Sequence, residues 1–306
     1  MSAELSSFDD VIELAFKRNV PWHGMGQEVK EDMSLDEMIH AAHMEWAVER
    51  QRILQSLPNG RVLKPEMDIL YRNDNFLPLS VVSPDYKIVQ PAEIFNFYRS
   101  LIEDAGYSMD VIGALRQGKK IWALAKTATV EIQQNDKLDC YLLLATSYDG
   151  SIATTAKFTT VRVVCENTLN MSLRESSSVR VRHSTTFKPE VVMDKLIAQN
   201  EWIEQTKTLI DLRVSQQLAQ DILIECINKK DPDKVRESKQ FQKIMELFNG
   251  GGTMIQPNSG WGFLNAVTEY CDWYGRESKS NDTRLDAIWF KESLKEKAYN
   301  VLTGEV

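Results

Sequence analysis

The sequence has 306 residues, of which 43% are hydrophobic, 26% charged and 9% aromatic. This composition excludes disordered, collagen-like and low-complexity proteins, and the length suits one large domain or two of about 150 residues each. No stretch approaches the ~18 consecutive apolar residues of a membrane-spanning helix, and the N-terminus lacks the pattern of a secretory signal. The four cysteines are widely spaced, so we expect reduced thiols in a cytoplasmic protein without a membrane partner.

Charge is distributed unevenly along the chain. It has 36 basic and 44 acidic residues, a formal net charge of −8. Residues 111–190 contain eleven basic and seven acidic residues, so this window carries +4 and the rest of the chain −12. We therefore expect a polyanionic partner to meet the middle of the chain. Composition alone favours the other interpretation, a solvated surface of mixed charge.

The N-terminal part is predicted to contain one helix among loops. Ser34 and Glu37 have the spacing of a capping box, and the apolar residues that follow, up to Trp46, share one helical face. A turn at 57–60 precedes short strands and loops. An amphipathic helix is predicted over 91–104, with a glycine after its last turn.

The middle of the chain is predicted to form antiparallel hairpins. Strand-like patterns occur in four runs, which are residues 109–115, 121–130, 140–146 and 151–158. Turn signals at Gln117-Gly118 and Asp149-Gly150 separate them in pairs. The pattern then predicts a helix over 160–175 and a half-exposed strand over 179–183.

From Pro189 onward the pattern predicts long helices, at about 192–210, 215–228, 236–248, 260–275 and 284–302. The predicted fold class is therefore α+β, with an antiparallel β-hairpin core packed on helices and a mainly helical C-terminal part. We divide the chain into residues 1–60 (loop and helix region), 61–188 (α+β core with a basic hairpin and helix) and 189–306 (helical region).

The segment Gly113–Lys120 is close to a phosphate-binding loop but departs from it in two ways. Its last position should be Ser or Thr, to hold magnesium, and is Lys120. The residues that follow have a strand pattern instead of a helical one. We interpret the segment as a hairpin tip that points Arg116, Lys119 and Lys120 outward, where they suit contacts to phosphates.

No motif completes a metal or hydrolase site. His40 and His43 stand at i, i+3 on a predicted helix, but no further spacing supplies the other ligands that zinc requires. The loop at 22–26 is similar to an oxyanion loop of esterases, yet the chain has no Gly-x-Ser-x-Gly motif. We predict that the protein uses no cofactor and no metal.

The densest basic stretch lies between Lys157 and Lys188. Arg180 and Arg182 alternate on a predicted strand, so both guanidinium groups project from one face and suit bidentate contacts to phosphate. The alternative is a surface whose arginines pair with carboxylates from the acidic ends of the chain. The C-terminal aromatic residues are expected to be core, the alternative being rings that stack bases. They are Trp261, Phe263, Tyr270, Trp273, Tyr274, Trp289 and Phe290.

Five short sequence words, in order along the chain, match those of a known family. They are Pro21–Gly26, Tyr86–Pro91, Arg162–Leu169, His183–Lys188 and Gly260–Tyr270. On these words the chain resembles the phage/plasmid-like proteins with the domain of unknown function 932. The resemblance covers almost the whole chain. It implies a context in phages, prophages and conjugative plasmids of bacteria, and no particular chemistry.

A second resemblance concerns the order of elements in the middle of the chain. Hairpins, an Asp-Gly turn, a strand and a basic helix are similar to the β-β-β-α core of single-strand annealing proteins. This likeness implies homo-oligomeric rings or filaments that hold a DNA strand in a basic groove, without metal or ATP. The expected nucleic-acid contacts are the cations of this region, Arg116, Lys119, Lys120, Lys126, Lys157, Arg162, Arg174, Arg180, Arg182 and Lys188.

The resulting hypothesis is a mobile-element protein that binds and anneals single-stranded DNA in recombination, in the cytoplasm of a bacterial host. Two other classes stay open. An antagonist of host defence would bind a host protein through the acidic surface outside 111–190. An enzyme, the less favoured class, would need His23, His183, Asp149 and Glu166 to converge in the fold.

Overall fold

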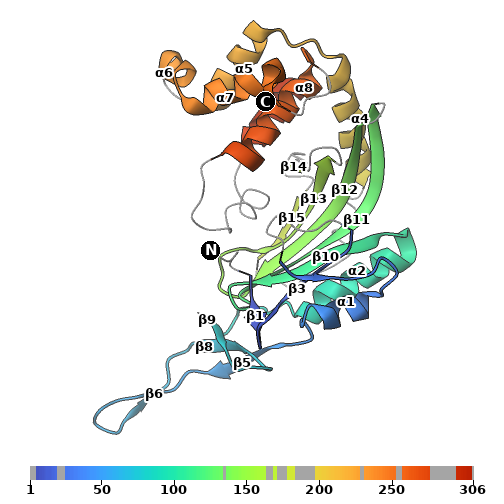
Figure 1. Ribbon diagram of the computed structural model, residues 1–306. Coiled ribbons are helices and arrows are strands. Elements are labelled where there is room, and N and C mark those ends of the chain that lie inside the picture. Colours follow the sequence, from blue (N-terminus) through green and yellow to red (C-terminus); the bar gives the residue numbers. More distant parts are fainter. Residues whose placement is uncertain are drawn as a thin grey trace. The chain divides into compact units, whose positions relative to one another are not determined.

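The computed structural model describes residues 5–18, 25–133, 136–162, 168–170, 178–182, 197–227, 231–252, 257–275 and 294–304 (Figure 1). By its internal contacts the chain divides into two compact units. Unit 1 comprises residues 1–127, 142–157 and 178–193, and unit 2 comprises residues 128–141, 158–177 and 194–306. The α+β fold class is confirmed. The division at residues 60 and 188 stays a prediction.

The largest sheet has the strand order β14-β13-β12-β11-β10-β3-β4, and β15 also pairs with β13. Its strands are β3 (Leu14–Phe16), β4 (Gln27–Glu28), β10 (Ser108–Leu115), β11 (Lys120–Gln133), β12 (Asp136–Ser147), β13 (Thr154–Arg162), β14 (Thr168–Asn170) and β15 (Ser178–Val181). β10 pairs antiparallel with β3 and β11, whereas β3 and β4 are parallel. The hairpin predicted around Gln117-Gly118 is confirmed, so Gly113–Lys120 is not a phosphate-binding loop.

Helix α1 (Leu35–Ala41) of unit 1 packs against β3 and β10. The Ser34 hydroxyl accepts a hydrogen bond from the Glu37 amide, and the Glu37 carboxylate accepts one from the Ser34 amide. The predicted capping box is therefore confirmed. The prediction that Trp46 shares this helix is wrong. The chain leaves the helix at once, because His43 has φ 52°, which an α-helix does not tolerate.

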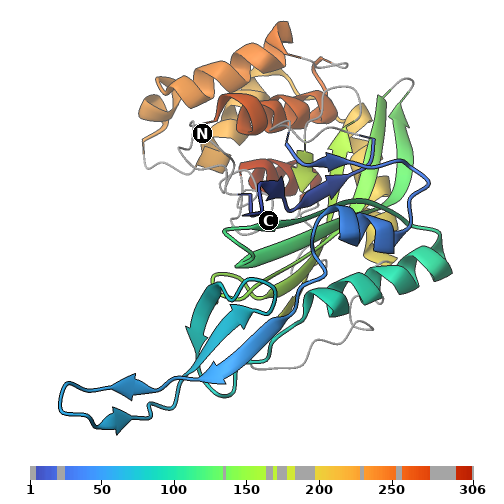
Figure 2. The same cartoon turned by 60° about the horizontal axis from the view of Figure 1, so that its bottom comes forward.

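Helix α2 (Pro91–Ala105) also packs against β10 (Figures 1 and 2). It starts with proline and ends before Gly106, whose φ of 69° is the left-handed cap that the sequence predicted. The buried Tyr98 hydroxyl lies 2.8 Å from the Ala123 carbonyl and 2.9 Å from the Leu142 carbonyl. One side chain thus joins the helix to β11 and β12.

Unit 1 contains further strands, several of them within residues 1–60, where the sequence predicted only loops and a helix. They are β1 (Ser7–Phe8), β2 (Val11–Ile12), β5 (Val48–Arg52), β6 (Gln55–Ser56), β7 (Val62–Leu63), β8 (Asp68–Arg72) and β9 (Pro78–Val82). β5, β8 and β9 form a three-stranded sheet, and β6 and β7 form a hairpin. The N-terminal strands of two or three residues are too short for a period-two pattern to reveal.

The helical elements of unit 2 are α4 (Ile197–Asp211), α5 (Gln216–Ile227), α6 (Pro232–Arg236), α7 (Lys239–Glu246), η1 (Leu247–Gly251), α8 (Gly260–Glu269), η2 (Tyr270–Tyr274) and α10 (Leu294–Thr303). They confirm a mainly helical C-terminal part. Every residue of α8 is buried. The indole Nε1 of Trp261 in α8 donates a hydrogen bond to the buried Asp136 carboxylate at 2.8 Å. This bond connects the start of β12 to α8 within unit 2.

The aromatic residues of the C-terminal part divide between core and surface. Trp261 and Phe263 are buried, as predicted, whereas Trp273 and Tyr274 are about half exposed, so for these two the prediction of a core position is wrong. Trp289 and Phe290 lie outside the described residues.

The helix predicted over 160–175 is wrong where the structure describes this segment. Residues 160–162 complete β13, and Thr168–Asn170 form β14. The segment begins with β-branched residues, and these favour an extended backbone beside a neighbouring strand. Residues 163–167 and 171–175 lie outside the described residues.

No helix within the described ranges has the length and apolar character needed to cross a bilayer. Cys140, Cys226 and Cys271 are thiols and not disulfides. Cys165 lies outside the described residues.

Candidate nucleic-acid interface

The pairing of β13 with β15 joins cationic positions from two segments of the chain. The register sets Thr155 opposite Arg180 and Lys157 opposite Ser178. Directly opposite residues share a face, and faces alternate along each strand. Positions 157 and 180 therefore lie on one face of this two-stranded ribbon.

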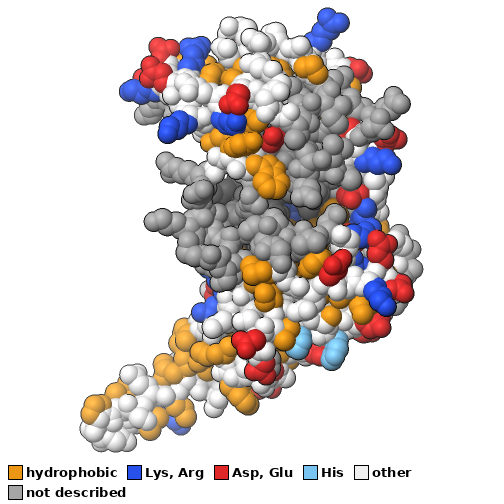
Figure 3. All heavy atoms as spheres, viewed as in Figure 1, with side chains coloured by type: hydrophobic (Ala, Val, Ile, Leu, Met, Phe, Trp, Pro, Cys, Tyr) orange, Lys and Arg blue, Asp and Glu red, His pale blue; other side chains and the backbone are white. Residues whose placement is uncertain are grey.

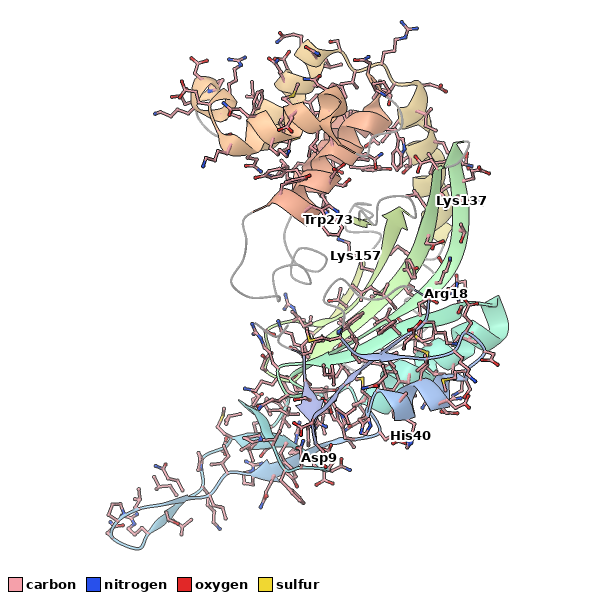
Figure 4. The ribbon with its side chains drawn as sticks, viewed as in Figure 1. Asp9, Arg18, His40, Lys137, Lys157 and Trp273 are labelled. Carbon is pink, nitrogen blue, oxygen red and sulfur yellow. The ribbon has the colours of Figure 1, made fainter. Side chains whose placement is uncertain are left out.

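We name residues 154–157 and 178–182 the cationic ribbon. Arg182 follows directly after β15, two positions beyond Arg180, and its side chain is exposed. Lys157, labelled in Figure 4, is half-buried. At about 3.4 Å per residue, the two arginine positions stand about 7 Å apart along the strand. The ribbon thus presents a short row of cationic positions.

Three other predicted residues cannot be assigned to this ribbon. Arg162 ends β13 within unit 2, and only its backbone is described. Arg174 and Lys188 lie outside the described residues.

The tip of the β10–β11 hairpin is held inside unit 1. Arg116, Gln117 and Gly118 have φ values of 53°, 60° and 89°. The buried Gly118 amide donates to the Ser6 hydroxyl at 2.8 Å. A Cβ atom at Gly118 would stand 3.1 Å from side-chain atoms of Arg72 and Trp46. The prediction of a tip that points all its cations outward is therefore wrong.

Lys120 shows this error most clearly, because it is only 3% exposed. Burial by itself raises the pKa of Asp149, but hydrogen bonds from Ser151 and Ser147 and the charge of Lys120 bring that pKa below its ordinary value. The Tyr148 amide also donates to the Lys119 carbonyl at 2.8 Å. The charge of Lys120 thus acts on a carboxylate of the protein itself. Arg116 and Lys119 are half-buried.

A buried ionic centre stands beside the tip. Glu13 and Arg72 are 0% and 1% exposed, and their ion pair measures 2.5 Å. Arg72 also contacts Asp74 at 2.6 Å and lies 4.2 Å from the centre of the Trp46 ring, a cation–π distance. Burial raises the pKa of Glu13, although Arg72 opposes this effect. The centre is internal to the fold and holds the tip in place.

Lys126 lies in a different cationic group, which includes a residue that the sequence analysis missed. Lys126 stands opposite Ser108 in the register. The guanidinium of Arg18 donates to the Ser108 hydroxyl at 2.7 Å and pairs with Asp110 at 3.1 Å (Figure 4). One sequence signal could have revealed Arg18. The apolar run Leu14–Phe16 is followed directly by two cations, Lys17 and Arg18, and this change of character indicates the end of a strand. Arg18 is thus engaged by a carboxylate of the protein itself.

No cluster of three or more His, Cys, Asp or Glu side chains that suits a metal ion occurs in the part of the chain that the structure describes. His40 lies 3.0 Å from Glu45 in an exposed pair. His23, His183 and Glu166, which the enzyme hypothesis needs, lie outside the described residues. Asp149 accepts a hydrogen bond from the Ser151 amide at 2.9 Å, as expected in a turn.

Comparison with known proteins identifies a family. The sequence model of the family described as Domain of unknown function (DUF932) matches residues 78–289, more than half of the chain. The matched segment includes the hairpin β10–β11 and the cationic ribbon. No curated protein and no solved structure matches the chain.

Proposed function

We propose that this protein, which belongs to the family of the domain of unknown function 932, binds single-stranded DNA through its cationic ribbon. In this proposal the DNA belongs to a phage, prophage or plasmid in the cytoplasm of a bacterial host. The protein acts as a homo-oligomer in recombination and promotes annealing of complementary strands without ATP.

The observation that carries the proposal is the register of β13 and β15, which sets positions 157 and 180 on one face. Arginine presents a planar fork of donors that matches the oxygen atoms of a phosphate. Contacts of this kind carry no sequence information, because every nucleotide has a phosphate. The ribbon therefore suits a DNA strand of any sequence.

The charge of the whole chain favours a local contact. With a net charge of −8, most of the protein surface repels a polyanion at long range. Binding then requires a region where cations gather on an exposed face. In unit 1 the ribbon brings the exposed Arg182 together with positions 157 and 180, whereas Lys120 is buried.

The test is fluorescence anisotropy of a labelled single-stranded oligonucleotide over a series of salt concentrations. The variant Arg180→Ala/Arg182→Ala removes two charges from the ribbon. For single strands each phosphate contact adds about 0.7 to the slope of log affinity against log salt, so we expect the slope to fall by about 1.4. We also expect the affinity of this variant for the oligonucleotide at low salt to be lower than that of the wild type.

The matched control is Lys234→Ala/Arg236→Ala on α6. It removes the same charge from exposed side chains that pair with Asp231 and Asp233 at i, i+3 spacing. We expect the salt dependence of this variant to equal that of the wild type. The proposal fails if the wild type does not bind at micromolar protein, or if both variants lose affinity equally.

Annealing requires its own measurement. Two complementary oligonucleotides, one with a fluorophore and one with a quencher, report duplex formation in the absence of ATP. We expect the wild type to accelerate quenching and the ribbon variant to lose most of that effect. A protein that binds single strands and leaves the annealing rate unchanged would contradict this part of the proposal.

A further inference from the structure

A two-stranded arm extends from the β5–β8–β9 sheet of unit 1 (Figures 1 and 2). We define the arm as residues 53–67. At its base the Ile53 amide donates to the Met67 carbonyl at 3.1 Å, and at its tip Gly60 turns the chain with φ 78°. An isolated two-stranded hairpin is only marginally stable in water. A surface that covers the arm would therefore stabilise it.

The arm and the sheet beside it carry a concentration of exposed apolar side chains (Figure 3). Among the described residues ten large apolar side chains are exposed, and six of these lie between residues 54 and 81. We name these six the apolar patch: Leu54, Val62, Leu63, Met67, Phe76 and Val81. Exposed apolar side chains gathered in this way are typical of an interaction site.

Each face of the arm carries an exposed apolar side chain. The register sets Ser56 opposite Val62 and Gln55 opposite Leu63. Neighbouring residues of a strand point to opposite faces, so Val62 and Leu63 lie on different sides. A flat surface covers one side of such an arm only. A partner with both an arm and a sheet face, as a second copy of this chain has, offers apolar surface to both sides.

The charges along the arm favour the same partner. Arg61 lies at the tip, the exposed Lys64 follows β7, and Glu66 lies at the base beside Met67. When two arms pack side by side in opposite directions, the tip of each lies next to the base of the other. Arg61 of one copy then meets Glu66 of the other, and this contact occurs twice in each dimer.

We infer that the arm is a dimerisation element, which packs with the apolar patch of one copy against the same patch of a second copy about a two-fold axis. A self-complementary patch of this kind closes on itself and gives a dimer. The inference concerns assembly alone and does not depend on DNA binding by the cationic ribbon.

Sedimentation velocity of the full-length protein, free of nucleic acid, tests the inference. We expect the wild type to form a dimer, and Leu63→Asn to raise the dimer dissociation constant at least tenfold. Leu218→Asn on α5 is the matched control, because both leucines are 43% exposed. We expect this control to remain a dimer. Circular dichroism verifies that the exposed substitutions leave the fold intact.

Charge reversal tests the direction of packing. We expect Arg61→Glu to weaken the dimer and the double variant Arg61→Glu/Glu66→Arg to restore it. The ribbon variant Arg180→Ala/Arg182→Ala should dimerise like the wild type, which separates this inference from the proposed function.

Four results would overturn the inference. They are a monomer at every concentration, equal weakening by Leu218→Asn, a larger open assembly that depends on Leu63, and an unchanged mass for Leu63→Asn. If that last variant instead loses binding to an oligonucleotide or to lipid vesicles, the arm contacts one of those partners.

Discussion

The hairpin tip and the cationic ribbon come from the same basic window of the sequence, yet they use their charges in different ways. At the tip, Lys120 is buried, and its charge adds to the hydrogen bonds from Ser151 and Ser147 that lower the pKa of Asp149. In the ribbon, Arg182 is exposed and stands two positions from Arg180. Charged residues in a sequence thus indicate a binding surface only where the fold leaves their side chains exposed to solvent.

The largest effect is expected at the ionic centre beside the tip. Arg72→Ala leaves Glu13 as an uncompensated buried charge, and we expect the free energy of unfolding to fall by about 3–5 kcal/mol. Urea denaturation followed by tryptophan fluorescence measures it. The control is Arg99→Ala, which breaks the exposed pair with Asp36 and should cost less than about 1 kcal/mol. Equal losses would mean that the tip is not held by this centre.

A smaller effect is expected from filling the space at the tip. Gly118→Ala combines a left-handed backbone with a Cβ atom 3.1 Å from Arg72 and Trp46, and we expect a loss of about 1–3 kcal/mol. Gly60→Ala shares the left-handed backbone, with φ 78°, but meets no atom within 4 Å. The difference between the two unfolding free energies isolates the packing contribution. No difference would contradict a tip packed inside unit 1.

The two carboxyl groups beside the tip are expected to change stability with pH in opposite directions. The pKa of Glu13 is raised above 4.5 in the folded protein, so the folded state binds this proton more readily and stability falls as pH rises through the folded pKa. The pKa of Asp149 is lowered below 3.8. The stability that Asp149 contributes is therefore present above pH 3.8 and is lost as pH falls through its folded pKa.

Urea midpoints measured between about pH 3 and pH 6 test these signs. We expect Glu13→Gln to remove a decline of stability with rising pH, and Asp149→Asn to remove a rise. If both variants change the slope of stability against pH in the same direction, the pKa shifts assigned to Glu13 and Asp149 are wrong.

The sequence predicted those parts of the fold whose signals are local. The capping box at Ser34, the glycine cap at Gly106 and the hairpin turn at Gly118 each depend on a few adjacent residues, and all three are confirmed. The segment at 160–175 has apolar spacing that fits a helix, but residues 160–161 pair antiparallel with residues 168–169, and this strand pairing decides the extended conformation. Such pairing is not visible in one sequence.

For the candidate site the sequence predicted the sign of the charge but not its accessibility. The alternation of Arg180 and Arg182 indicated a strand, and the structure describes one at Ser178–Val181. That Lys157 shares a face with position 180 follows only from the strand register. The packing of the tip at Gly118 depends on residues as distant in sequence as Ser6 and Arg72, so no local pattern reveals it.

The most direct test of the account compares equal charge removal from the ribbon and from the tip. Anisotropy of a single-stranded oligonucleotide is measured over a salt series for Arg180→Ala/Arg182→Ala and for Arg116→Ala/Lys119→Ala. The account predicts that the salt slope falls by about 1.4 for the ribbon variant and stays at the wild-type value for the tip variant. A larger fall for the tip variant, or the same fall for both, would contradict it.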